Sequence, residues 1–153
     1  MSADEPVSDL TSHLGYWLRL VSNHVSHTFA RALDDEAVTV AEWAVLRSLY
    51  GQGAVAPSRL ADRMGLTRGA ISKLADRLAA KGLVERQDNA DDGRAHTLRL
   101  TAAGQGLTPK LAAVADRNDA AFFAPLAAAD RADLQRILKA LADRHGLKAT
   151  PVS

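Results

Sequence analysis

The fold is decided by the stretch from Ala56 to Thr101, APSRLADRMGLTRGAISKLADRLAAKGLVERQDNADDGRAHTLRLT. Its first half predicts two short helices that meet at a tight turn, because two apolar stripes at helical spacing are separated by Gly65, a residue that accepts positive φ. Thr67 stands where it would cap the second helix. The residues expected to be buried are Leu60, Ala61 and Met64 in the first helix and Ile71, Leu74, Ala75 and Leu78 in the second.

The opposite face of the second helix is small and basic, and it carries Arg68, Gly69, Ser72, Lys73, Asp76 and Arg77. The helix is expected to end at Lys81-Gly82, a common C-cap pattern. Two alternating apolar–polar runs follow, LVERQ and HTLRL, and the turn DNADDGR between them predicts a β-hairpin, to which residues 54–56 are expected to add a short third strand. A helix-turn-helix followed by a hairpin is a winged helix. Such a domain places one helix in a DNA major groove and the hairpin tip near a minor groove.

Three segments resemble the MarR family of bacterial transcription regulators. DDGRAHTLRLTAAG is similar to the family's wing signature, in which Asp-x-Arg precedes a strand ending Leu-Thr-x-x-Gly; the matching residues are Asp92, Arg94, Leu100, Thr101 and Gly104. VAEWAVLRSL (40–49) and LADRMGLTRGAISKLADRLAAKGLVER (60–86) are similar to the family's first winged-helix helix and its helix-turn-helix. The resemblance spans roughly residues 14–104, and it implies a homodimer that binds double-stranded DNA.

Length and composition fit one globular domain with helical extensions. The chain has 153 residues, a net charge of +1 and no cysteine, which excludes disulfides and thiolate metal sites. The charge is unevenly distributed. Residues 1–56 contain three Lys and Arg against seven Asp and Glu, whereas residues 57–99, which make up most of the predicted winged helix-turn-helix domain (39–101, here called the reading head), contain nine against six. An acidic body with a basic reading head suits an oriented, reversible DNA binder better than a non-specific nucleic-acid coat.

Helices are predicted on both sides of the winged helix. Apolar residues recur at helical spacing from Leu10 to Leu33, and helix resumes after Thr101, with a kink or a fresh start expected at Thr108-Pro109 and a last helix capped by Asp130. The first of these helices has too much apolar surface for a small winged helix to bury alone. We therefore predict a disordered N-terminus (1–8), a winged helix-turn-helix domain (39–101) and a helical dimerisation region (9–35 and 102–147).

The predicted DNA-binding residues are Thr67, Arg68, Gly69, Ser72, Lys73, Arg77, Asp92 and Arg94. Arg94, at the hairpin tip, suits a narrow, electronegative minor groove, and Asp92 is placed to hold it in pose. Basic and hydroxyl side chains on the second helix suit phosphates and base edges, and Thr67 lies at the helix N-terminus, where phosphate binds. Asp76 disfavours a nearby phosphate and is expected to orient a neighbouring cation of its own helix. The alternative is an ordinary solvated helix face, with the wing arginine paired to a neighbouring aspartate.

The resemblance also implies a small-molecule effector, because members of the family often bind aromatic acids in a cleft between the dimer helices and the reading head. The residues expected to line this cleft are Tyr16, Trp17, His24, Trp43 and Arg47. The alternative is that the tryptophans belong to the core and that Arg47 is an ion-pair partner. His24 and His27, with His13 and Glu42, offer the donors of a zinc site, but histidines near a helix surface are usually ordinary polar residues. We predict no metal and no cofactor.

The predicted fold class is mainly α with a small β wing, a winged helix-turn-helix between N- and C-terminal dimerisation helices. The predicted function is a sequence-specific, homodimeric regulator of transcription, a repressor on a promoter palindrome that a small ligand relieves. The alternative is a winged-helix module for protein–protein assembly. No catalytic triad, phosphate-binding glycine loop or metalloprotease motif is present, so no enzyme is expected. No apolar run approaches the roughly 18 residues that cross a bilayer, and MSADEPVSD is unlike a signal peptide, so we expect a cytoplasmic protein.

Overall fold

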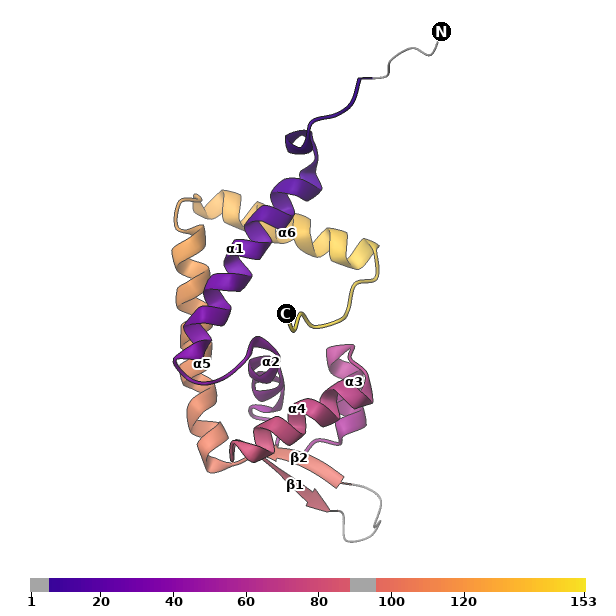
Figure 1. The fold of residues 1–153 in the computed structure, drawn as a ribbon, viewed down its shortest axis with the longest axis vertical. Helices are drawn as coiled ribbons and strands as arrows, with labels where there is room; N and C mark the ends of the chain where they lie inside the picture. The colour runs from indigo at the N-terminus through magenta and orange to yellow at the C-terminus, as the bar shows by residue number, and fades with distance from the viewer. Residues whose placement is uncertain (1–5, 89–95) are drawn as a thin grey trace.

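The computed structural model describes residues 6–88 and 96–153, and it is mainly helical with one small antiparallel sheet, as the sequence predicted (Figure 1). The elements in chain order are the 3-10 turn η1 (Leu10–Ser12), the helices α1 (Leu14–Asp34), α2 (Val40–Leu49), α3 (Pro57–Met64) and α4 (Arg68–Ala80), the strands β1 (Val84–Asp88) and β2 (His96–Leu100), and the helices α5 (Ala102–Phe123) and α6 (Ala128–Arg144). Helices α1 and α5 pack on each other, whereas α2, α3, α4 and the sheet form the reading head at the other end of the molecule.

One hydrophobic core lies beneath α4. The residues predicted to be buried in α3 and α4 are all buried, since none of them exceeds the 7% exposure of Leu74. Leu98 of the sheet and Leu46 of α2 are fully buried in the same core, to which α1 contributes Leu33 and α5 contributes Leu111. The two long helices therefore share the core of the reading head at the ends where they join it.

The predicted hairpin is present as an antiparallel pair of strands. Val84 pairs with Leu100 and Asp88 pairs with His96. The third strand predicted at 54–56 is reduced to a single bridge, in which Val55 and Leu98 exchange backbone hydrogen bonds of 2.8 Å in both directions. The chain leaves this bridge after one residue because Pro57, with φ already fixed, begins α3.

Threonine caps begin the helices on which the reading head depends. The Thr67 hydroxyl accepts from the Ala70 N–H at the start of α4, and the Thr101 hydroxyl accepts from the Gly104 N–H at the start of α5. Gly65 ends α3 with φ of 65°, as the sequence predicted. Each cap satisfies a backbone N–H that the first helical turn leaves without a partner.

Three predicted helix boundaries were wrong. The first helix begins at Leu14, because the residues before it form η1. Helix α5 is one helix that contains Pro109, so the fresh start predicted at Thr108-Pro109 was wrong. Thr101 has already capped the helix, and Thr108 and Leu111 are buried on either side of the proline, so packing outweighs the one backbone hydrogen bond lost there. Helix α6 begins after Ala127, which places Asp130 in its first turn, where a carboxylate favours the helix dipole, and not at its cap.

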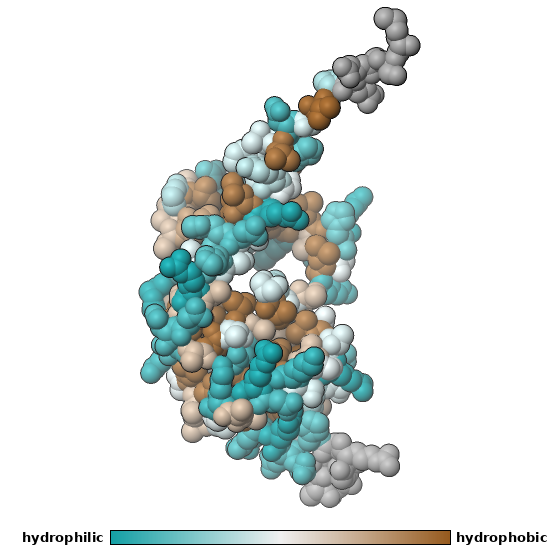
Figure 2. Space-filling view, in the orientation of Figure 1, coloured by the Kyte–Doolittle hydropathy of each residue, from teal (hydrophilic) through white to brown (hydrophobic). Residues whose placement is uncertain are grey.

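Large apolar side chains remain exposed on α1 and α6, and brown patches over these helices are visible in Figure 2. The stripe predicted on the first helix is buried only near its end, because Leu33 is inaccessible whereas Leu14 is 87% exposed. Helix α6 buries no residue at all in this chain. The exposed large apolar residues of the two helices are Leu14, Tyr16, Trp17, Leu18, Leu20 and Val21 in α1 and Ile137, Leu138 and Leu141 in α6.

At Gly104, α5 passes very close to the residues that follow α4. A Cβ added there would overlap the carbonyl oxygen of Leu83, whereas a Cβ at Gly106, in the same helix, would meet nothing within 4 Å. We expect Gly104→Ala to lower the free energy of unfolding by about 1–3 kcal/mol through overpacking. Gly106→Ala should raise it by about 0.5–1 kcal/mol, because alanine loses less backbone entropy in a helix.

Urea denaturation followed by circular dichroism measures both changes. Equal effects of the two substitutions would contradict the close approach at Leu83.

Candidate nucleic-acid interface

Helix α4 presents the predicted basic face to solvent. Thr67, Arg68, Gly69, Ser72, Lys73 and Arg77 are all exposed, while the other side of the helix is fixed in the core. Figure 2 shows the corresponding surface as a hydrophilic area over the lower part of the molecule. Orientation follows from the pattern of the helix, since burying one stripe of a 3.6-residue period turns the opposite stripe outward.

An ion pair joins the wing to α4. Arg86 Nη1 of β1 lies 2.6 Å from Asp76 Oδ1, and Arg86 Nη2 donates to the carbonyl oxygen of Ser72 at 3.4 Å. The expectation that Asp76 orients a cation of its own helix was therefore wrong, because its partner comes from the neighbouring strand. The pair is more than a third exposed on both sides, so it adds little stability. Its effect is to fix the wing beside the helix.

An open groove of about 340 Å³ lies between α4, the beginning of α3 and the base of the wing. Its lining is basic and hydroxyl-bearing where it is polar. The residues that line it are Ala56, Pro57, Ser58, Arg68, Ser72, Ala75, Arg86, His96 and Leu98. The groove thus places Arg68 of α4 and Arg86 of the wing base on one surface. The wing-tip residues Asp92 and Arg94 lie outside the described residues, and their role stays a prediction.

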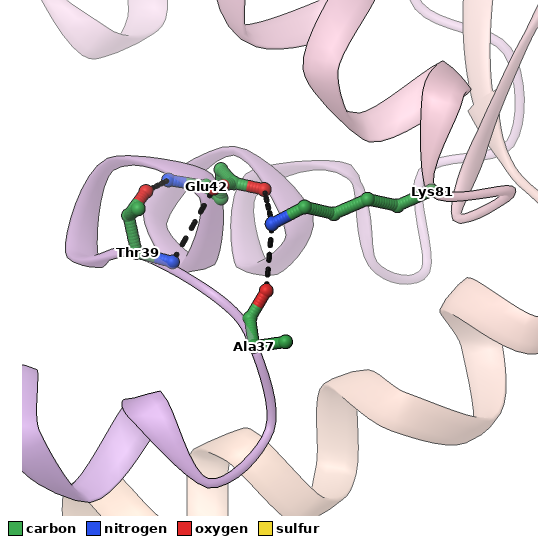
Figure 3. Close-up of polar contacts among 4 residues, drawn as sticks. All are labelled: Ala37, Thr39, Glu42 and Lys81. Atoms are coloured by element: carbon green, nitrogen blue, oxygen red, sulfur yellow. Dashed lines mark hydrogen bonds and ion pairs between the residues drawn. The ribbon is translucent and has the colours of Figure 1, made fainter.

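Glu42 is a buried charge with a structural task. Its side chain is 2% exposed, and it forms a capping box with Thr39 at the start of α2. Oε2 lies 2.7 Å from the Lys81 ammonium (Figure 3). Within residues 6–88 and 96–153, no three His, Cys, Asp or Glu side chains converge as a metal site requires. In that same part of the chain no helix combines the length and apolarity needed to cross a membrane.

A second cavity, of about 420 Å³, lies between α1, α2, α5 and the C-terminal residues. It contains two of the five predicted effector-binding residues, Trp43 and Arg47. Trp43 packs edge-on against Phe29, with 6.5 Å between the ring centroids, whereas Arg47 is exposed at the cavity. The residues that line it are Val25, Ser26, Phe29, Val40, Trp43, Ala44, Arg47, Ser48, Ala115, Asn118, Asp119, Thr150, Pro151 and Ser153.

The other three predicted effector residues lie away from this cavity. Tyr16 and Trp17 stack edge-to-face at the exposed start of α1, where Trp17 Nε1 donates to the Thr11 carbonyl at 2.9 Å. His24 packs against Phe122 of α5, with 5.6 Å between the ring centroids. The structure brings Trp43 and Arg47 together in one cavity and does not place the other three with them. A ligand-binding role for any of the five stays a prediction.

The C-terminal residues were missed by the sequence analysis. The Thr150 N–H donates to the Met64 carbonyl at 2.7 Å, and the backbone of Ala149 lies 2.9 Å from where a Gly65 Cβ would be. Val152 packs against the core of the reading head. Nothing in the sequence LKATPVS signals these contacts, because they join segments far apart in the chain without periodicity or a motif.

Comparison with known proteins gives the same fold and family. A model of the MarR family matches residues 38–95. The repressor MdtR of Bacillus subtilis (strain 168) is 32% identical over 103 residues, which make up 67% of this chain and 64% of MdtR. The chain thus spans slightly less than two thirds of that relative.

Two solved structures extend the likeness to nearly the whole chain. A mutant MarR from Escherichia coli complexed with operator DNA superposes with a TM-score of 0.76 and 26% identity, over 88% of this chain and 99% of that one. The PcaV regulator from Streptomyces coelicolor, in complex with its natural ligand, superposes with a TM-score of 0.73 and 27% identity, over 91% of this chain and 98% of that one.

These likenesses agree with the fold and with the site. The structure has a winged helix flanked by long helices, and α4 presents a basic face. The relatives are regulators of transcription and not enzymes. The chain belongs to the MarR family of transcriptional regulators.

Proposed function

We propose that this protein is a cytoplasmic, sequence-specific regulator that binds double-stranded DNA as a homodimer, represses a promoter containing a near-palindromic site, and is released by a small ligand. The observation that carries the proposal is the exposed basic face of α4 beside a wing held to it by Arg86 and Asp76. A rigid cationic helix with small residues at its beginning fits a major groove, and a neighbouring wing reaches the adjacent backbone or minor groove.

The residues on the exposed face of α4 support two roles in DNA recognition: cations that bind phosphates and base edges, and a small residue that allows close approach. Lys73, Arg68 and Arg77 supply positive charge for phosphates and base edges. Gly69, near the helix N-terminus, has open space around its Cα, which allows a backbone to approach. The mutant MarR complexed with operator DNA supports the same use of a similar fold.

The exposed apolar residues of α1 and α6 support a dimer. A helix such as α6, with Leu138 and Leu141 exposed and nothing buried, is stable in water only where another surface covers that face. A two-fold partner covers it with the same residues and presents two α4 helices about one turn of DNA apart, which requires a near-palindromic site.

The cavity at Trp43 and Arg47 supports an effector. It lies where α1 and α5 meet α2, so a ligand there touches both the long helices and the reading head. The walls are largely apolar and carry a cation, Arg47, and a carboxylate, Asp119; the guanidinium suits the carboxylate of a flat aromatic acid. A ligand that prefers the spacing unable to bind DNA lowers DNA affinity by linkage. MdtR is a named repressor and PcaV is crystallised with its natural ligand, which support the sign and the mechanism.

Selection from a pool of random duplexes tests the proposal most directly. We expect an inverted repeat to be enriched, which reports sequence recognition and two-fold symmetry together. Recovery of no preferred sequence, with salt-sensitive binding to acidic proteins, would instead support a protein–protein assembly module.

Substitution of one cation in α4 and of one in the wing should each weaken duplex binding. Lys73→Ala is expected to reduce the slope of log affinity against log salt by about one and to weaken all duplexes alike, if it contacts phosphate. Arg94→Ala should weaken binding by about 1–3 kcal/mol. Fluorescence anisotropy over a range of salt concentrations measures both. Arg136→Ala is the control that should bind normally, because Arg136 lies on α6 and its ion-pair partner among residues 6–88 and 96–153 is Asp133. Unchanged binding by Arg94→Ala would remove the wing from the mechanism.

A charge within the exposed apolar face of α6 should dissociate the dimer. We expect Leu141→Glu to sediment as a monomer at micromolar concentrations, because burying an unpaired carboxylate in an interface costs several kcal/mol. Lys139→Glu, on the opposite side of α6, changes charge without entering that face and should remain dimeric. Sedimentation velocity distinguishes the two, and a dimeric Leu141→Glu protein would contradict the proposed interface.

The Arg47 guanidinium should make release of DNA depend on a carboxylate. We expect millimolar benzoate to weaken operator binding by several-fold, within the usual 5- to 150-fold range of allosteric coupling. Benzamide, which has the same ring without the charge, should have little effect. Arg47→Gln should bind the operator normally but lose the response to benzoate. Equal responses of the variant and the parent protein would exclude Arg47 from effector recognition.

A further inference from the structure

The C-terminal end of α4 is tied to both segments that lead to the long helices. On one side, Thr101, the cap of α5, donates its hydroxyl to the Gly82 carbonyl at 2.6 Å and its backbone N–H to the Leu83 carbonyl at 3.1 Å. On the other side, the Lys81 side chain crosses to the turn between α1 and α2, where Figure 3 shows its ammonium between Glu42 and Ala37.

The ion pair on this second side is strongly constrained. Glu42 Oε1 accepts from the Thr39 N–H at 3.4 Å, and the Glu42 N–H donates to the Thr39 hydroxyl at 3.1 Å, so the carboxylate cannot turn away without breaking the cap of α2. Oε2 is buried and has no hydrogen-bond partner of good geometry among the described residues, so the ammonium 2.7 Å away is what compensates its charge. A buried carboxylate without a compensating cation is strongly unfavourable.

The same ammonium also holds the turn. Lys81 Nζ donates to the Ala37 carbonyl at 2.6 Å. Ala37 has φ of 55°, in the left-handed region that alanine rarely adopts, so its conformation depends on the contacts around it. One side chain at the end of α4 therefore fixes the charged cap of α2 and the strained residue that connects α1 to α2.

We propose that Lys81 is a positioning residue for DNA recognition: through Glu42 and Ala37 it fixes the angle between α4 and α1, and so sets the half-site spacing that a dimer accepts. The inference rests on the proposed function and adds to it the residue that determines spacing. Lys81 itself contacts no DNA in this scheme.

The size of the expected effect follows from the length of the helix. Helix α4 has 13 residues, so it is about 20 Å long at 1.5 Å per residue. A tilt of about 10° at the Lys81 end moves the other end by about 3.5 Å, which is close to the 3.4 Å rise of one base pair. Loss of the contacts of Lys81 with Glu42 and Ala37 is therefore enough to weaken the preference for one half-site spacing.

The test uses the full-length protein and the inverted repeat that it selects, with the two half-sites moved apart or together one base pair at a time. The parent protein should prefer one spacing by about tenfold or more. Lys81→Met removes both contacts but leaves the Glu42 charge buried and threatens folding. The double variant Glu42→Gln, Lys81→Met removes that charge as well, because glutamine keeps the capping oxygen. Thermal melting establishes which of them is folded.

We expect the double variant to bind a single half-site with nearly normal affinity while its preference among spacings falls to about threefold or less. Lys81→Arg, which keeps the cation, should preserve the preference. Lys110→Met, on α5, removes an exposed lysine without touching Glu42 and is the control for charge.

A folded double variant that keeps the parental spacing profile would overturn the inference and leave the proposed function intact. If the parent protein selects no inverted repeat, the proposed function fails, and the inference fails with it. The inference would also be overturned if the double variant lost as much affinity for a single half-site as for the repeats of every spacing. Such a uniform loss would show that the substitutions do not act through the angle between α4 and α1.

Discussion

Burial of one face of α4 is the constraint on which the rest of the structure depends. Ile71 and Leu78 are fully inaccessible, and they meet the core formed by α2, α3 and the sheet. The helix cannot rotate without exposing these side chains, each of which is worth roughly 1.5–3 kcal/mol when buried. The basic stripe on the other side is therefore held outward by hydrophobic packing, before any charge interaction is considered.

The wing and the long helices are placed relative to this helix by short polar contacts. Arg86 and Asp76 hold the wing beside α4, Thr101 and Gly104 bring the start of α5 against the residues that follow α4, and Lys81 reaches the start of α2. The Arg86–Asp76 pair is exposed and adds little to stability, whereas the Lys81–Glu42 pair has a buried carboxylate. Their value is geometric, because a protein that reads two half-sites must keep its reading heads at a fixed angle to its dimer helices.

Two further surface features fit the proposed regulator: exposed apolar residues on the long helices and a cavity beside the reading head. Apolar residues on α1 and α6 are left exposed by the described part of the chain, while the cavity at Trp43 and Arg47 lies where the long helices meet the reading head. The C-terminal residues reach the same place and bind the carbonyl of Met64 at the end of α3. Under the proposed function, a ligand in this cavity would contact both parts of the molecule, whose relative position would govern DNA binding.

The sequence by itself determined most of the features that the local preferences of the chain control. The stripe of Ile71 and Leu78, the Gly65 turn, the Thr67 and Thr101 caps and the hairpin all follow from periodicity and from the conformational preferences of single residues. The same reasoning predicted the outward basic face of α4. Where it failed locally, at Pro109 and Asp130, packing and an earlier helix start outweighed the preference of one residue.

Only the tertiary structure decided the contacts between distant segments. The Lys81 ammonium binds the carbonyl of a residue 44 positions away, and neither that lysine nor Glu42 carries a local sign of its partner. Asp76 likewise pairs with Arg86 on the neighbouring strand β1. Of the five residues predicted to bind an effector, Trp43 and Arg47 line the same cavity and the other three do not. Periodicity fixes which side of an element faces the core, but not which element lies opposite; that choice is made by the packing of the whole chain.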